Sequence, residues 1–371
     1  MSVDPAAAPV GASAGAFASA DRPVRFLVLA DGHFGPMTSK TANACIRYSP
    51  DRVVGVVDSL TAGQTVEQVL GFGGAIPVVA TLEEGLALGP TAVLVGIAPA
   101  GGQLPQPWRE TIAAAARRGL DVWSGLHYFL SDDPMLAEAA AAGGARILDL
   151  RRPPADLVVS TGRVRDVAST IVLTVGSDCN IGKMTTQLQL RDAMRARGQR
   201  VAFAPTGQTG ILVEGWGIGV DAVIADFIGG AAERLTLQGA EQGDIVLVEG
   251  QGSIIHPSYS GVTYGLLHGS LPHAMVLCHQ PSRTTIYRNA WVPIPPLQEL
   301  VALHEAVAAP LRPAPVIAIA LNTFDLSDAD ARSAIARAEA ETGLPATDPV
   351  RFDPAPLVDA ITAFHEARTT R

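Results

Sequence analysis

Residues 175–186 read Val-Gly-Ser-Asp-Cys-Asn-Ile-Gly-Lys-Met-Thr-Thr, and this stretch decides the fold of the second half of the chain. It follows the apolar run Thr170–Thr174 and opens a segment of helical character that ends near Arg197. A glycine-rich turn between a strand and a helix, closed by Gly-Lys and hydroxyl residues, is the layout of a P-loop. The backbone N–H groups of such a loop bind anions, so the pattern predicts a site for a phosphorylated ligand.

The loop departs from the usual P-loop pattern in two places. Five residues rather than four separate Gly176 from Gly182, and Met184 stands where Ser or Thr normally binds magnesium. Phosphate binding follows from the pattern, whereas ATP hydrolysis does not. We expect the phosphorylated ligand to be held by Gly176, Asn180, Gly182, Lys183, Thr185 and Thr186.

Composition limits the classes of function that remain. The chain has 371 residues, 48% hydrophobic and 17% charged, with a net charge of -9. This length favours two domains. An acidic chain without a basic stripe argues against a nucleic-acid partner. No apolar run reaches the roughly 18 residues that would span a membrane.

The cysteines are sparse and form no disulfide or zinc pattern, which suits the cytoplasm and predicts no bound metal. They are Cys45, Cys179 and Cys278. Cys179 lies beside the expected start of a helix, where a thiol can have a lowered pKa. It is therefore either a nucleophile or a small residue that fills the loop.

Short β-branched runs alternate with Ala- and Leu-rich stretches, which predicts α/β domains with parallel sheets covered on both faces. The expected strands are 24–30, 52–58, 76–79, 92–97, 121–123, 145–149, 169–175, 200–205, 244–249, 274–278 and 315–321. The expected helices are 81–88, 108–118, 133–142, 182–197, 221–238, 297–308, 328–342 and 354–368.

Three segments follow from this pattern: a disordered tail over residues 1–22, a Rossmann-like domain over 23–152 and a P-loop domain over 153–371. The paired prolines Pro153-Pro154 mark the linker. In the first domain Asp58 ends the second expected strand, as a ribose-binding acid would. The first turn lacks G-x-G-x-x-G, so a doubly wound scaffold is expected there rather than a dinucleotide site.

Strand ends converge on the P-loop if the second sheet is parallel. One is followed by residues 205–210 and another by 249–253. Glu249 emerges from an apolar strand, so it is a candidate magnesium ligand, general base, or structural partner of a neighbouring N–H or of Lys183. His256, seven residues later, is a second candidate base or an ordinary polar residue of its loop.

These motifs resemble known families. The five-residue spacing and the sequence Val-Glu-Gly-Gln-Gly at 248–252 resemble the dethiobiotin synthetase branch of P-loop proteins. The longer set is similar to a family long labelled a domain of unknown function and now associated with D-glutamate N-acetyltransferase, whose members pair a Rossmann-like domain with a P-loop-like domain. That set comprises residues 176–186, 205–210, 249–253, 256–257 and 293–297.

The resemblance implies an acyltransferase with acetyl-CoA as co-substrate. The acceptor amine then needs a base, and Glu249 is the first candidate for this catalytic residue and His256 the second. The P-loop would bind the phosphates of acetyl-CoA. The oxyanion needs donors, and the N–H groups of Gly250 and Gly252, or the side chains of Gln208 and Ser253, are candidates. Arginines would pair the carboxylates of an acidic amino acid such as D-glutamate. The expected substrate-binding residues are Thr206, Gln208, Gln251, Ser253, Arg283 and Arg288. The two arginines lie in an expected long loop from Gln280 to Pro296.

Two other functions stay open. An enzyme of the dethiobiotin synthetase type would use ATP and magnesium with Lys183, Thr185 and Glu249 to activate a carboxylate, which Met184 disfavours. A non-catalytic nucleotide-binding switch or metallochaperone is the third, and it lacks a metal-binding cluster in the sequence. The expected partner is a small-molecule substrate, and a homo-oligomer is expected because most enzymes of this kind are symmetric assemblies.

Overall fold

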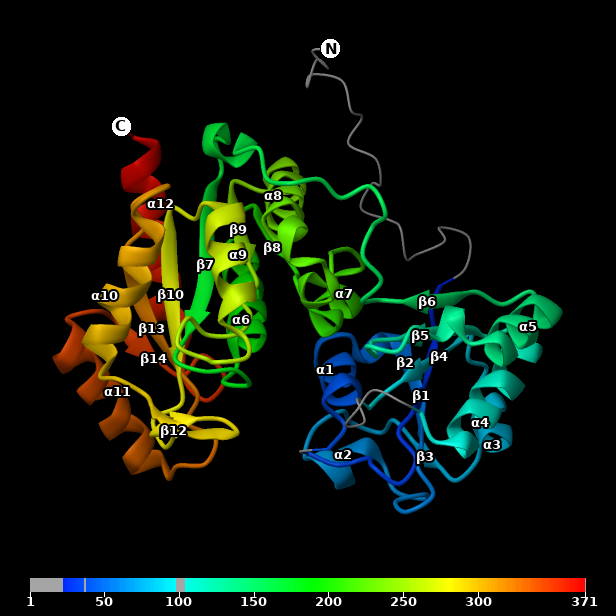
Figure 1. The fold of residues 1–371 in the computed structure, drawn as a ribbon. Helices are drawn as coiled ribbons and strands as arrows, with labels where there is room; N and C mark the ends of the chain where they lie inside the picture. Colours follow the sequence, from blue (N-terminus) through cyan, green and yellow to red (C-terminus); the bar gives the residue numbers. More distant parts are fainter. Residues whose placement is uncertain (1–22, 37, 98–103, 371) are drawn as a thin grey trace, which may run out of the picture. The chain divides into compact units, whose positions relative to one another are not determined.

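The computed structural model describes residues 23–36, 38–97 and 104–370, so the tail expected over 1–22 lies outside the described residues. The chain divides into two compact units. The first contains the described residues up to Arg152 together with Ile211–Trp216, and the second contains Pro153–Gly210 and the chain from Gly217 onward. Each unit is a six-stranded sheet with helices packed on it (Figure 1).

The first unit is a parallel sheet in the order β3-β2-β1-β4-β5-β6, the arrangement of a Rossmann fold. All six strands overlap the expected ranges: β1 (Phe26–Leu29), β2 (Val53–Val57), β3 (Val78–Val79), β4 (Ala92–Val95), β5 (Asp121–Ser124) and β6 (Ile147–Asp149). Its helices are α1 (Lys40–Tyr48), α2 (Val66–Leu70), α3 (Leu82–Leu86), α4 (Gln106–Arg117) and α5 (Pro134–Gly143). The sequence patterns missed α1 and α2.

Asp58 connects the loops that follow β1 and β2 through hydrogen bonds of its side chain. Its buried carboxylate accepts hydrogen bonds from the N–H of Gly32 at 2.7 Å and from the N–H and hydroxyl of Thr61 at 3.0 and 2.6 Å. Both oxygens are therefore engaged within the unit. This arrangement agrees with a scaffold rather than a ribose-binding acid.

The second unit is also a parallel sheet, in the order β14-β13-β10-β7-β9-β8. The strands are β7 (Thr170–Gly176), β8 (Val201–Ala204), β9 (Ile245–Val248), β10 (Ala274–His279), β13 (Val316–Leu321) and β14 (Ala346–Thr347). Every residue of β7 is buried, as a central strand covered on both faces requires. Because β9 pairs directly with β7, the loop that begins at Glu249 lies next to the P-loop.

Two groups of helices cover this sheet, as right-handed crossovers between parallel strands require. Helices α6 (Lys183–Ala196) and α12 (Ala355–Thr369) pack together, and the second group is α8 (Ala225–Gln242), α9 (Ser260–Ser270), α10 (Leu297–Ala308) and α11 (Asp328–Thr342). The eight expected helices of the chain are all present, whereas α9 and α7 (Gln208–Glu214) were missed. None of the helices in the described residues is long and apolar enough to cross a membrane.

The segment from Gln280 to Pro296, expected as a long loop, contains a small hairpin. Strand β11 (Thr285–Ile286) pairs antiparallel with β12 (Asn289–Pro293). Arg288 occupies the turn with φ of 60°, in the left-handed region. Strands of two and five residues are too short to carry a readable alternation of polar and apolar residues, which explains why the loop prediction was wrong.

Residues 158–162, near the start of the second unit, are held against α8 by hydrogen bonds and close packing. The Glu233 carboxylate accepts hydrogen bonds from the hydroxyl of Ser160 at 2.7 Å and from the N–H of Gly162 at 2.6 Å. One turn earlier in α8, a Cβ at Gly230 would lie 1.7 Å from the carbonyl oxygen of Val158. The glycine therefore permits the close approach of this backbone to the helix.

We predict that Gly230→Ala destabilises the second unit by at least about 2 kcal/mol, because the added methyl group overlaps a backbone carbonyl. The matched control is Gly229→Ala in the same helix, where the nearest atom to the new Cβ is 3.5 Å away. The control should be neutral or slightly stabilising because alanine favours helix. Thermal unfolding measures both, and equal melting temperatures for the two variants would contradict the packing argument.

Candidate functional site

The P-loop joins β7 to α6 and curls around the ammonium group of Lys183. Lys183 is buried, and its Nζ donates to the carbonyl oxygen of Asp178 at 2.7 Å. Asn180 and Gly182 have φ of 54° and 100°, and left-handed residues of this kind turn successive N–H groups to one side of a loop. A Cβ at Gly176 would lie 2.8 Å from Ile181 Cδ1. The loop thus has backbone conformations typical of an anion nest, beside a buried lysine, and its binding of a ligand stays a prediction.

The two hydroxyl residues after the lysine have different surroundings. Thr186 is buried in α6 and its hydroxyl accepts from the thiol of Cys278 in β10, with 3.7 Å between sulfur and oxygen. Thr185 is half-buried. The hydroxyl of Thr186 thus lies against the core of the sheet, which leaves Thr185 as the better candidate to contact a ligand.

Glu249 comes directly after β9, and backbone N–H groups hold its carboxylate. Oε2 accepts from the N–H of Thr206 at 2.8 Å and from the N–H of Gly207 at 3.0 Å, while the Thr206 hydroxyl donates to the Glu249 carbonyl at 2.9 Å. Burial is the main cause that raises the pKa of this carboxyl to about 7, and the two N–H groups oppose the rise. A carboxyl with this pKa can gain or lose a proton near neutral pH.

The loop after Glu249 is locked to the loop after β8. The side-chain amide of Gln251 donates to the carbonyl of Thr206 at 2.5 Å, and the hydroxyl of Thr263 in α9 donates to the carbonyl of Gln251 at 2.7 Å. Ser253 is buried beside them and Gln208 is half-buried at the start of α7 (Gln208–Glu214). The structure therefore brings Thr206 and Gln251 into contact around Glu249.

One of the proposed oxyanion donors is already engaged. The N–H of Gly250 donates to the hydroxyl of Thr174 in β7 at 3.0 Å, and a Cβ at Gly250 would lie 1.6 Å from the Thr174 carbonyl oxygen. The expectation that Gly250 offers its N–H to a substrate was wrong. Its role is to let β9 and β7 approach closely at the point where the two loops begin.

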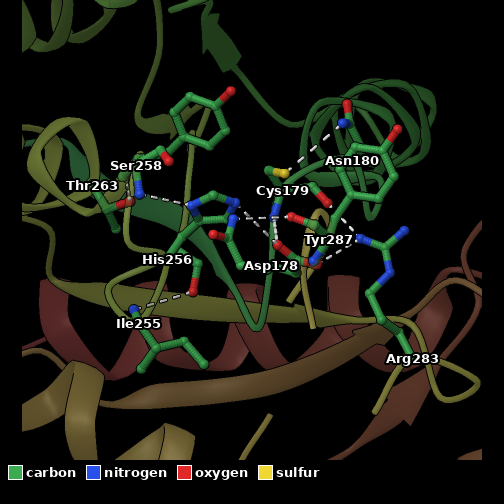
Figure 2. Close-up of polar contacts among 12 residues, drawn as sticks. Asp178, Cys179, Asn180, Ile255, His256, Ser258, Thr263, Arg283 and Tyr287 are labelled. Atoms are coloured by element: carbon green, nitrogen blue, oxygen red, sulfur yellow. Dashed lines mark hydrogen bonds and ion pairs between the residues drawn. The ribbon is translucent and has the colours of Figure 1, made fainter. Parts of the chain in front are cut away.

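Asp178 organises the P-loop, and the sequence patterns did not single it out. Its carboxylate is fully buried; Oδ1 accepts from the N–H of Cys179 at 2.7 Å, and Oδ2 accepts from Arg283 at 2.8 Å and from the N–H of Tyr287 at 2.7 Å (Figure 2). An acidic residue inside a loop that binds anions needs a cationic partner. The presence of an aspartate in the P-loop was therefore the signal in the sequence that could have identified Asp178.

Arg283, expected to bind a substrate carboxylate, contacts Asp178 and the carbonyl of Cys179, both at 2.8 Å. Arg288 is exposed, with its guanidinium 5.4 Å from the centre of the Tyr287 ring. The β11–β12 hairpin is thus tied to the P-loop through Arg283 and Tyr287. The role of Arg288 as a ligand-binding residue stays a prediction.

His256 also lies at the P-loop. Its ring is buried and accepts a hydrogen bond at Nδ1 from the N–H of Ser258 at 3.0 Å, and its Nε2 lies 4.0 Å from Oδ1 of Asp178 (Figure 2). The ring of Tyr259 packs on it at 4.5 Å between centroids. His256 is therefore not an ordinary loop residue at the surface but a fixed group beside the anion nest.

Asp178, Cys179 and His256 offer three possible metal-ligand atoms within 4.8 Å of one another, a cluster that the sequence patterns did not reveal. A histidine that ligates through Nε2 normally donates its other N–H to an acceptor. Here Nδ1 itself accepts from Ser258, so a metal on Nε2 would cost that hydrogen bond. The tautomer of the ring disfavours a metal at this cluster.

Cys179 is not activated as a nucleophile. Burial and the charge of Asp178 raise the pKa of its thiol, and the opposing effects of Lys183 and Arg283 are smaller. The lowered pKa that a thiol beside a helix can have is not found here, because burial first and the Asp178 carboxylate second both oppose ionisation of the thiol. Cys179 therefore fits the role of a small residue that fills the loop.

The fold and site define a two-domain α/β protein with a Rossmann-like domain and a P-loop domain. Two family models match this chain: a P-loop domain described as a domain of unknown function (DUF1611_C) over residues 158–358, and a Rossmann-like domain of unknown function (DUF1611_N) over residues 59–153. The chain belongs to the DUF1611 family. The resemblance drawn from its motifs is confirmed.

Relatives and a solved structure support the same assignment. A protein of Tritonibacter scottomollicae named D-glutamate N-acetyltransferase is 41% identical over 76% of this chain and 84% of its own length. One of Pseudoalteromonas with the same name is 37% identical over 72% of this chain and 80% of its own length. The crystal structure of a DUF1611 family protein from Anabaena variabilis has a TM-score of 0.87 and 40% identity, covering 92% of this chain and 99% of that one.

The raised pKa of Glu249 predicts a pH dependence of stability. The folded protein keeps this proton up to about pH 7, whereas the unfolded chain loses it near 4.5. The stability that Glu249 contributes is therefore fully present below pH 4.5 and is lost as the pH rises to about 7. The side chain in Glu249→Gln stays neutral at every pH and serves as the reference. Relative to this variant, the unfolding free energy of the wild type should fall by up to about 3 kcal/mol over this range, at roughly 1.4 kcal/mol per pKa unit.

Urea unfolding of both proteins at intervals between pH 4.5 and 8 measures this difference. The unfolding free energy of the wild type minus that of the variant should fall as the pH rises and level off above about 7. Parallel curves over the whole range would show that Glu249 titrates near its ordinary value.

Proposed function

We propose that this protein is a D-glutamate N-acetyltransferase, which moves the acetyl group of acetyl-CoA to the amine of D-glutamate. The observation that carries the proposal is the identity of 41% to a relative of that name, over 84% of the relative's length. The site offers an anion nest for the phosphates of CoA and a carboxyl group with a pKa near 7. The first feature suits the binding of CoA, and the second suits removal of a proton from the acceptor amine.

The P-loop is proposed to bind the phosphates of acetyl-CoA. Lys183 supplies the charge, and Thr185 with the backbone of Asn180 and Gly182 supplies hydrogen-bond donors. Acyl transfer from a thioester involves no phosphoryl chemistry, so a tightly held magnesium ion is dispensable. Met184 at the usual magnesium position agrees with this use of the loop.

Glu249 is proposed to be the general base. The amine of an amino acid is an ammonium at neutral pH and must lose a proton before it attacks the thioester. A carboxyl whose pKa is about 7 accepts that proton more readily than one near the ordinary value of 4.5. The N–H groups of Thr206 and Gly207 fix the orientation of its carboxylate.

Polar side chains of the loops at Glu249 and a charged side chain of the β11–β12 hairpin are proposed to bind the acceptor amino acid. Arg288 is the arginine best placed to pair with a carboxylate, because Arg283 is paired with Asp178. Gln208, Gln251 and Ser253 are proposed to complete this subsite. A small-molecule acceptor, a cytoplasmic location and a symmetric homo-oligomer remain part of the proposal.

The direct test mixes the purified protein with acetyl-CoA and a panel of D- and L-amino acids and follows the release of free CoA thiol. Release stimulated by D-glutamate, with N-acetyl-D-glutamate identified by mass spectrometry, is the expected result. Parallel reactions with ATP and magnesium test the dethiobiotin synthetase type of chemistry. ATP turnover without thiol release from acetyl-CoA would overturn the proposal.

Two substitutions separate binding from chemistry. Lys183→Ala should raise the KM for acetyl-CoA by roughly tenfold or more, because a charged hydrogen bond to phosphate contributes about 1.5–3 kcal/mol. Glu249→Gln should leave that KM unchanged within about threefold and lower kcat by roughly 10²–10⁴, the usual effect of losing a general base. Steady-state kinetics check both, and an equal loss of acetyl-CoA binding in the two variants would assign Glu249 a structural role.

A further inference from the structure

The imidazole of His256 is held rigidly with one nitrogen unpartnered. Nδ1 accepts from the N–H of Ser258, the ring packs on Tyr259, and the carbonyl of His256 accepts from the N–H of Ser260 at the start of α9. His256 is 2% exposed. Among the residues that the structure describes, no atom forms a hydrogen bond with Nε2.

The hydrogen bond from Ser258 decides which nitrogen carries the proton. A backbone N–H can only donate, so Nδ1 must present its lone pair to it. The neutral ring then carries its proton on Nε2. His256 therefore presents an N–H donor, and not a lone pair, beside the P-loop (Figure 2). This protonation state is that of a hydrogen-bond donor or acid rather than of a general base.

Asp178 does not use this donor. The 4.0 Å between Nε2 and Oδ1 is too long for a hydrogen bond. The same carboxylate already accepts from Cys179, Arg283 and Tyr287, so its charge is compensated from the other side. A buried donor left without a partner costs stability, and such groups persist where a function requires them.

We propose that the Nε2–H of His256 binds the carbonyl oxygen of the acetyl thioester and stabilises the oxyanion that forms during transfer. This inference rests on the proposed acetyltransferase function and deepens it. It also replaces the role of general base that the sequence suggested for His256. The donor is fixed before the substrate arrives, which is the requirement for stabilising charge that develops in a transition state.

The neutral amine attacks the thioester carbon, a C–N bond forms, and the carbonyl electron pair moves to oxygen, where the Nε2–H of His256 stabilises it. The carbonyl then re-forms, the C–S bond breaks and CoA departs as a thiolate. The proton that Glu249 took from the ammonium passes to the thiolate, and the second proton lost by nitrogen goes to water, which gives the N-acetyl amino acid, the free thiol and one released proton.

Two amide variants test this role because neither amide is a base. In His256→Gln the side-chain NH₂ reaches the position of Nε2 and keeps a donor there. In His256→Asn the amide oxygen can still accept from Ser258, but no donor reaches the position of Nε2. The control is His268→Gln in α9, whose ring contacts the carbonyl of Val307 away from the P-loop.

We expect His256→Gln to keep kcat within about tenfold of the wild type and His256→Asn to lower kcat by roughly 10²–10³, the range for loss of one oxyanion donor. The KM for acetyl-CoA and the melting temperature should change little in both variants, and the His268→Gln control should match the wild type. An equal large loss of kcat in Gln and Asn variants would assign His256 a base role and overturn the proposal. A loss of kcat that is accompanied by a lower melting temperature or a higher KM would assign His256 a structural role.

Thiol release by the wild-type protein distinguishes a failure of this proposal from a failure of the proposed acetyltransferase function. If the wild-type protein releases no thiol with any amino acid, the acetyltransferase function itself fails. If the wild type is active and His256→Asn is as active as the control, the acetyltransferase function stands and only the donor role of His256 is overturned.

Discussion

The buried ammonium of Lys183 is the constraint on which the rest of the site depends. A charge removed from water requires compensation, and burial lowers the pKa of this lysine while nearby Asp178 and Glu249 oppose that change. The carbonyl of Asp178 holds the ammonium directly, and Arg283 balances the Asp178 carboxylate. Because Glu249 is neutral over part of the physiological range, the site carries a positive excess that favours an anionic ligand.

The site is built from two groups of loops at this edge of the sheet. Loops from β7 and β10 and the β11–β12 hairpin enclose the anion nest, whereas β9 and β8 supply Glu249 and the N–H groups that hold it. His279 at the end of β10 contacts the hydroxyl of Ser177 at 2.9 Å, and burial lowers the pKa of its ring to about 4. It is therefore neutral at pH 7 and adds no charge beside the loop.

Much of the fold was predictable because its signals are local. The buried strands of the two sheets are apolar runs, and the glycines and lysine of the P-loop stand at fixed spacing after β7. The environment of Glu249 also followed from its place at the end of an apolar strand. What the patterns missed depends on contacts between distant parts of the chain, since Arg283 and Tyr287 reach Asp178 across more than 100 residues. The tautomer of His256 is set by a single backbone N–H and leaves no trace in the sequence.

The central claim is that this P-loop binds the phosphates of CoA rather than a magnesium nucleotide. Calorimetric titration of the protein with CoA and with pantetheine, which has the same thiol arm without phosphates, tests it most directly. The account predicts that CoA binds at least about a hundredfold more tightly than pantetheine, since several charge-assisted hydrogen bonds to phosphate are lost, and that magnesium does not change CoA binding. Equal affinity for CoA and pantetheine, or ATP binding that requires magnesium and exceeds the affinity for CoA, would contradict it.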